Sequence, residues 1–146
     1  MDWLFRDPVI LWDFVPLFAF VLLLAILPRV NRPGGIWLAL LVISTTIWLV
    51  GEVLDIGVTD LDIKLFWTRV RYLGVVIVPV AWFFFVCHHC RKAQWVRPRN
   101  IILLSIIPAM TVVLVFTNEY HHLVWRRAWV DRLWGSPFIN NEHAIW

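Results

Sequence analysis

Four long apolar runs, separated by short polar segments, constrain the fold of this chain more than any other feature. Each run approaches the roughly 20 residues that a helix needs to cross the hydrocarbon core of a bilayer. Hydrophobic residues make up 61% of the chain, and the mean hydropathy is +0.76. A soluble domain of 146 residues cannot bury that much apolar surface, so the sequence predicts an integral membrane protein.

The same runs predict an all-α fold, a polytopic transmembrane helix bundle with four spanning helices. Lipid offers no partner for a backbone N–H or C=O, and the runs are too long and too uniformly apolar to be barrel strands. We expect helices at about residues 8–27, 36–57, 65–88 and 101–117, within a single membrane domain covering residues 1–146. Residues 118–146 are rich in Trp and Arg and predict an interfacial segment, either a surface anchor or a lid over the bundle.

The basic residues indicate how the chain is oriented. All ten acidic residues lie on or towards one side of the predicted bundle, whereas the segments 28–35 and 88–100 on the other side contain no acidic residue. The positive-inside rule therefore places these two loops in the cytoplasm and both termini outside, in a multi-pass protein of the plasma (inner) membrane. The loops contain Arg29, Arg32, Arg91, Lys92, Arg97 and Arg99.

The basic residues do not predict a nucleic-acid partner. The formal net charge is +3, but the cations form short clusters between apolar runs instead of lining one surface.

Charged residues near the end of the second run are candidates for function. Helical spacing puts Trp48, Glu52 and Asp55 on one face. A charge inside the outer leaflet costs free energy unless it is paired or hydrated, so Glu52 is expected to form an ion pair with a cation from the third helix. Arg71, the deeper of two candidates, is favoured over Arg69. Such a pair either joins neighbouring helices during assembly, or lines a ligand-accessible pocket or forms a breakable switch. In a further alternative, both side chains extend towards the membrane surface and do not meet.

Cysteine and histidine residues do not predict a metal site. Cys87 and Cys90 have the two-residue spacing of a zinc ribbon and flank two histidines, but the other three histidines fall across the bilayer from them. The chain also shows no phosphate-binding loop, nucleophile elbow or HExxH helix. We therefore expect no cofactor, no metal and no enzymatic activity in this chain.

An ordered series of motifs runs from about residue 47 to residue 125. It comprises Trp48, Glu52, Phe66-Trp67, Arg71-Tyr72-Leu73-Gly74, Pro79, Trp82, Phe85, Pro108, Thr117-Asn118, His121, Leu123 and Trp125. In order and spacing this series resembles the N-terminal seven-helix membrane region of sensor histidine kinases. The resemblance implies a sensory input module with an extracellular amino terminus, which passes a signal to a cytoplasmic output domain.

The resemblance also implies an output kinase domain and three further helices, which we do not find in this sequence. We therefore expect either a piece of a longer histidine kinase or a remnant that pairs with another chain. The leading hypothesis is a membrane sensory input module, and the alternative is a structural or assembly subunit of a membrane complex without a ligand. Candidates for the polar core or ligand site are Trp48, Glu52, Arg71, Tyr72, Trp82, Asn118 and His121.

The expected partners are those of a membrane sensor. They are the lipid bilayer, a small hydrophobic or amphipathic ligand, and a second membrane chain or a homodimer.

Overall fold

A computed structural model of the chain describes residues 8–26, 34–56, 58–133 and 136–143. The elements follow in the order α1 (Pro8–Ile26), α2 (Gly35–Ile56), α3 (Leu61–His89), the 3₁₀ turn η2 (Ala93–Trp95), α4 (Pro98–Phe116), α5 (Asn118–His121), β1 (Trp125–Leu133) and β2 (Ser136–His143). Most of the predicted cytoplasmic loop 28–35 lies outside the described residues.

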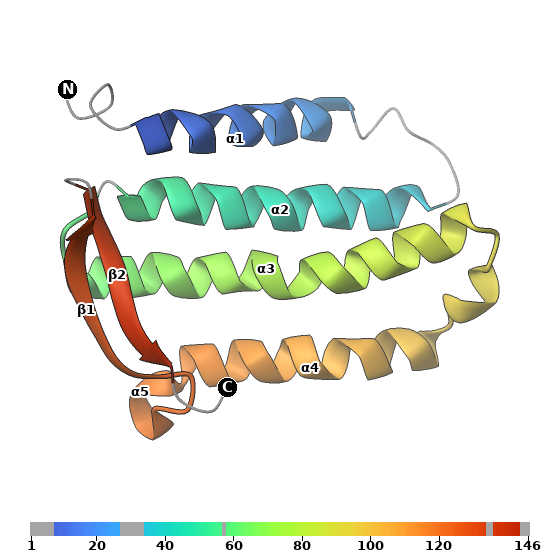
Figure 1. Cartoon of the computed structure of the whole chain (residues 1–146). Helices are drawn as coiled ribbons and strands as arrows, with labels where there is room; N and C mark the ends of the chain where they lie inside the picture. The colour runs from blue at the N-terminus through green and yellow to red at the C-terminus, as the bar shows by residue number, and fades with distance from the viewer. Residues whose placement is uncertain (1–7, 27–33, 57, 134–135, 144–146) are drawn as a thin grey trace.

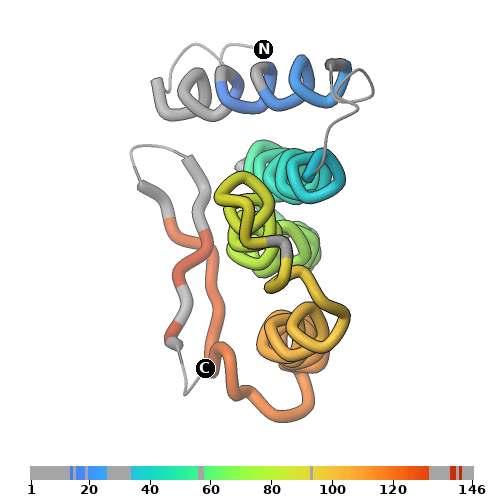
Figure 2. Tube along the Cα trace, turned by 90° about the vertical axis from the view of Figure 1, so that its right-hand side faces the viewer, coloured from blue at the N-terminus to red at the C-terminus, as the bar shows by residue number. Residues whose placement is uncertain are grey.

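The helices α1 to α4 lie side by side in chain order and form one row (Figure 1). In the view along the helix axes, each helix lies beside its neighbours in the chain (Figure 2), and α2 and α3 pack most extensively. This part of the predicted helix bundle is therefore an open layer of helices. An open layer is possible because lipid, unlike water, does not force apolar faces to be buried.

Three helices in the described part of the chain, α2, α3 and α4, are long and apolar enough to cross a membrane. Their hydropathy is that of a multi-pass membrane protein. In α1 the corresponding apolar stretch is shorter, Pro16–Ala25. The count of four spans therefore stays a prediction.

Two helices begin several residues before the start of the apolar run from which they were predicted. α3 begins at Leu61 instead of residue 65, because Asp60 caps it: its Oδ1 accepts hydrogen bonds from the backbone N–H groups of Asp62 (3.0 Å) and Ile63 (3.1 Å). α4 begins at Pro98 instead of residue 101, with proline in the first turn, where its missing N–H has no cost. Both first turns are polar, so an apolar run does not reveal them.

A glycine sets the close packing of α2 against α3. A Cβ atom at Gly74 of α3 would lie 2.3 Å from the carbonyl oxygen of Ser44 and 2.7 Å from the backbone nitrogen of Trp48, both in α2. No side chain fits at such distances. Gly74 therefore lets the two helix backbones touch, in the way that small residues do in membrane helix pairs.

The prediction of an all-α fold is wrong for residues 125–133 and 136–143, which form strands. After the short α5, β1 and β2 pair as an antiparallel hairpin in which Trp129 faces Asn140 and Val130 faces Ile139, with an irregularity between Trp125 and Arg127. Aromatic and β-branched residues favour strands, but the hairpin lacks the regular alternation that would reveal them in the sequence.

The hairpin crosses the helix row at the end where α2 finishes and α3 begins (Figure 1). β1 contacts α3, and β2 contacts α2. We call this the hairpin end of the molecule. Both expected roles of the tail, a surface anchor and a lid, stay predictions.

Candidate functional site

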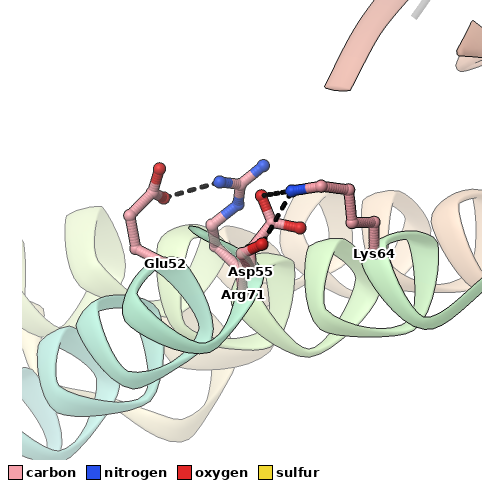
Figure 3. A network of polar contacts seen from close by, with 4 residues as sticks. All are labelled: Glu52, Asp55, Lys64 and Arg71. Carbon is pink, nitrogen blue, oxygen red and sulfur yellow. Dashed lines mark hydrogen bonds and ion pairs between the residues drawn. The ribbon is translucent and has the colours of Figure 1, made fainter. Parts of the chain in front are cut away.

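Two ion pairs join α2 to α3 near the hairpin end (Figure 3). Nη1 of Arg71 donates to Oε2 of Glu52 at 2.6 Å. Nζ of Lys64 lies 3.4 Å from Oδ2 of Asp55 and donates to the Asp55 backbone carbonyl at 2.7 Å. The sequence favoured Arg71 over Arg69 as the partner of Glu52, and in the structure the partner is Arg71.

The two pairs differ in how far they are shielded. The side chains of Glu52 and Arg71 are 36% and 23% exposed, whereas those of Asp55 and Lys64 are 10% and 0% exposed. Gly51 allows the close approach of Arg71, since a Cβ there would lie 3.1 Å from the Arg71 Cβ. The Asp55–Lys64 pair therefore acts as an internal staple, while the Glu52–Arg71 pair is open to a neighbouring molecule.

Buried polar atoms without a protein partner lie in the same region. They are Oδ1 of Asp55, Oγ1 of Thr68 and Nε of Arg69, among the described side chains. Thr68 follows Lys64 by one helical turn, on the face of α3 that is buried with it. The cluster thus keeps hydrogen-bonding capacity that its own ion pairs do not use.

Asn118 fixes the start of the hairpin. Its Oδ1 accepts from the backbone N–H groups of Val124 (2.9 Å) and Trp125 (3.3 Å), and its Nδ2 donates to the Trp125 carbonyl (2.9 Å). The Trp125 ring packs on Tyr72 of α3, with ring centroids 6.4 Å apart, beside buried Val115 of α4. Asn118 and Tyr72 therefore hold the hairpin on the helices and are structural in this arrangement.

α5 is tied down by two further contacts. Glu119 forms an ion pair with Arg69 of α3. His121 uses both ring nitrogens: Nε2 lies 3.0 Å from Oγ1 of Thr117, and Nδ1 accepts from the backbone N–H of Leu123 at 3.0 Å. His121 thus shapes the turn between α4 and β1.

The two tryptophan candidates lie at the surface. Trp48 is 39% exposed, and its backbone and Cβ lie against Gly74. Trp82 is 55% exposed and packs on Phe85 with ring centroids 6.0 Å apart, about three turns along α3 from Arg71. The structure therefore brings Glu52 together with Arg71, and Tyr72 together with Asn118 through Trp125, but it does not gather all seven candidates into one site.

Sequence reasoning missed two ion pairs of this region. Asp55 was expected to share a helix face with Trp48 and Glu52, and Lys64 was not among the candidates. The signal was present: an Asp before a helical pattern is a capping residue, and a cap at Asp60 puts Lys64 in the first turn of α3. The pairing of Arg69 with Glu119 had no local signal, because α5 lies 50 residues further along the chain.

Comparison with known protein families shows to which family the chain is related. Residues 14–146 match the family described as the N-terminal 7TM region of histidine kinase. The chain belongs to this family. The resemblance inferred from the motifs is thereby confirmed, and the match makes the chain a membrane input region of the histidine-kinase type, a kind of module that is not itself catalytic. In the same comparisons no curated protein and no solved structure matches the chain.

Proposed function

We propose that this chain is the sensory input part of a two-component signalling protein, which converts an event at the hairpin end into a change in the arrangement of its helices. The observation that carries the proposal is the Glu52–Arg71 pair, a partly exposed ion pair between two helices of a sensor family. A charge pair within a membrane segment is costly to keep, and such groups are functional candidates by default. No catalytic role is assigned to any residue.

The packing of the row suggests which helices move. α2 and α3 touch through Gly74 and are joined by two ion pairs, whereas α4 is packed lightly on α3 and most of its side chains are exposed. A switch needs an element with two arrangements of similar energy. The α2–α3 pair is then the fixed part and α4 is the mobile part, and the contacts of α5 and the hairpin with α2 and α3 change when α4 moves.

The orientation proposed for this function places the hairpin end outside and η2 in the cytoplasm of an inner membrane. Arg91 and Lys92 precede η2 in the sequence, and Arg97 and Arg99 follow it. The connection from α3 to α4, which contains η2, lies at the end of the helices opposite the hairpin (Figure 1). This separation of charge supports the positive-inside assignment. For the proposed output, a kinase domain reached through further helices, the support is the family alone.

Distances between spin labels in lipid nanodiscs test the proposed movement. Leu54, Ile63 and Phe116 are exposed and lie at the hairpin ends of α2, α3 and α4. Labels on Ile63 and Phe116 should give a broad or two-peaked distance distribution that shifts when Glu52→Gln removes the ion pair. Labels on Leu54 and Ile63 are the control and should give one peak in both proteins.

A single narrow peak for Ile63 and Phe116, unchanged by Glu52→Gln, would argue against a switch. Recovery of a second membrane chain in equal amount during purification would then favour the alternative function, an assembly subunit without a ligand.

A further inference from the structure

An apolar groove lies between α3 and α4, away from the ion pairs. Its volume is about 490 Å³, within the range of small-molecule sites. The groove is centred on the middle of both helices: Val75 is the central residue of α3 (Leu61–His89) and Ile107 that of α4 (Pro98–Phe116). Its lining includes Val75, Pro79, Phe83, Leu104, Pro108 and Thr111.

Each helix contributes a proline to this groove together with the residue four positions before it. Proline has no N–H, so Pro79 cannot donate to the carbonyl of Val75, and Pro108 cannot donate to that of Leu104. The freed carbonyl lies on the same side of its helix as the proline ring. Because Val75 and Leu104 line the groove with their prolines, the groove has a backbone acceptor on each wall.

Two carbonyls in the middle of a membrane that lack their usual helix donors are unusual. Backbone groups in hydrocarbon need an internal partner, and an acyl chain of a lipid has no donor to offer. A molecule with a hydroxyl group and an apolar body would fill the groove and satisfy a freed carbonyl at the same time. The apolar lining excludes a charged ligand.

A further helix is a poorer occupant than a small molecule, because the backbone N–H groups of a helix are already paired within it and cannot donate to the freed carbonyls.

We propose that the α3–α4 groove binds a membrane-soluble alcohol, with its apolar chain between the helices and its hydroxyl donating to the carbonyl of Val75 or Leu104. The site lies between the fixed and the mobile part of the row, so such a ligand would set the α3–α4 distance. The proposal rests on the proposed function for its role as a stimulus, whereas binding itself is measured on the purified chain.

Photolabelling of the full chain in nanodiscs tests the site. The probes are a diazirine analogue of decanol and its methyl ether, which has the same chain but no donor. The alcohol should label peptides containing residues 75–83 and 104–111, saturably and at a roughly tenfold lower concentration than the ether, the ratio expected for one hydrogen bond to an otherwise unpaired acceptor.

Proline variants distinguish the contribution of the hydrogen bond to binding from that of the apolar contacts in the groove. Pro79→Ala with Pro108→Ala restores both N–H donors, so the alcohol should lose its tenfold advantage while the ether labels as before. Pro16→Ala, at a helical proline in α1 outside the groove, is the matched control and should keep the advantage. Ile107→Trp fills the groove and should abolish saturable labelling by both probes.

Several results would overturn the proposal. They are equal labelling by the alcohol and the ether in the wild-type chain, a preference that survives the double proline variant, loss of ether labelling in that variant, and labelling that persists in Ile107→Trp. Absence of saturable labelling would mean that another helix or a second copy covers the groove. None of these results bears on the spin-label test of the switch, so the two proposals fail separately.

Discussion

Replacing Gly74 by alanine should separate α2 from α3. The new Cβ would lie 2.3 Å from the Ser44 carbonyl oxygen, whereas ordinary contact begins at 3.4 Å, so the helices must move apart by about 1 Å. Overpacking of this kind costs about 1–3 kcal/mol, and we expect the upper end because the atoms that clash belong to the backbone. The better helix propensity of alanine offsets about 1 kcal/mol at most. A net loss of about 1–2 kcal/mol in the free energy of unfolding follows.

Gly51→Ala is the matched control for this prediction. Its Cβ would meet the Arg71 side chain at 3.1 Å and the Arg71 backbone at 3.3 Å, so shifts of a few tenths of an ångström are enough. The assay is reversible unfolding in mixed detergent micelles with increasing dodecyl sulfate, followed by circular dichroism. A Gly74→Ala protein as stable as the wild type, or a Gly51→Ala protein that is less stable than Gly74→Ala, would refute the close backbone contact.

Three further predictions concern the polar contacts. Lys64→Met leaves the Asp55 carboxylate buried without its partner and should cost about 3–5 kcal/mol in the same unfolding assay. Asn118→Ala removes three hydrogen bonds to the backbone at the start of the hairpin and should increase amide hydrogen exchange at residues 124 and 125 by at least tenfold. A double-mutant cycle with Glu52→Gln and Arg71→Gln should give a coupling energy of about 0.5–3 kcal/mol.

Each of these predictions has its own control or contrary result. Asn100→Ala removes one exposed hydrogen bond to the Trp95 carbonyl and should leave exchange in the hairpin unchanged. Full stability of Lys64→Met would show that the buried pair is not a staple. Additive effects in the Glu52 and Arg71 cycle would show that the two side chains do not interact.

The sequence predicted the helices well because hydropathy alone controls which segments can enter lipid. The same rule could not locate the polar first turn of α3, for which the cap at Asp60 was the relevant signal. The Glu52–Arg71 contact was predictable since consecutive helices joined by a short connection are neighbours and a charge in lipid needs a partner.

The hairpin and its contacts could not be predicted in the same way. The density of Trp and Arg fits the headgroup region and a strand equally well. Only the pairing between β1 and β2 shows that the segment forms strands. The contact of Asn118 with the backbone of Trp125 depends on that turn. Trp82 was expected in the polar core, but lipid lets a large apolar ring remain exposed, so its type and spacing carry no information on burial.

Accessibility of single cysteines in intact cells tests the membrane arrangement most directly. Cys87→Ala with Cys90→Ser removes the natural thiols, and cysteine is then introduced at Arg97 or at Glu142, both exposed and at opposite ends of the helix row. A maleimide that cannot cross membranes should label the variant at position 142 in intact cells, and the variant at position 97 only after the cells are opened. Labelling of position 97 in intact cells, or of neither position until the cells are opened, would contradict the account.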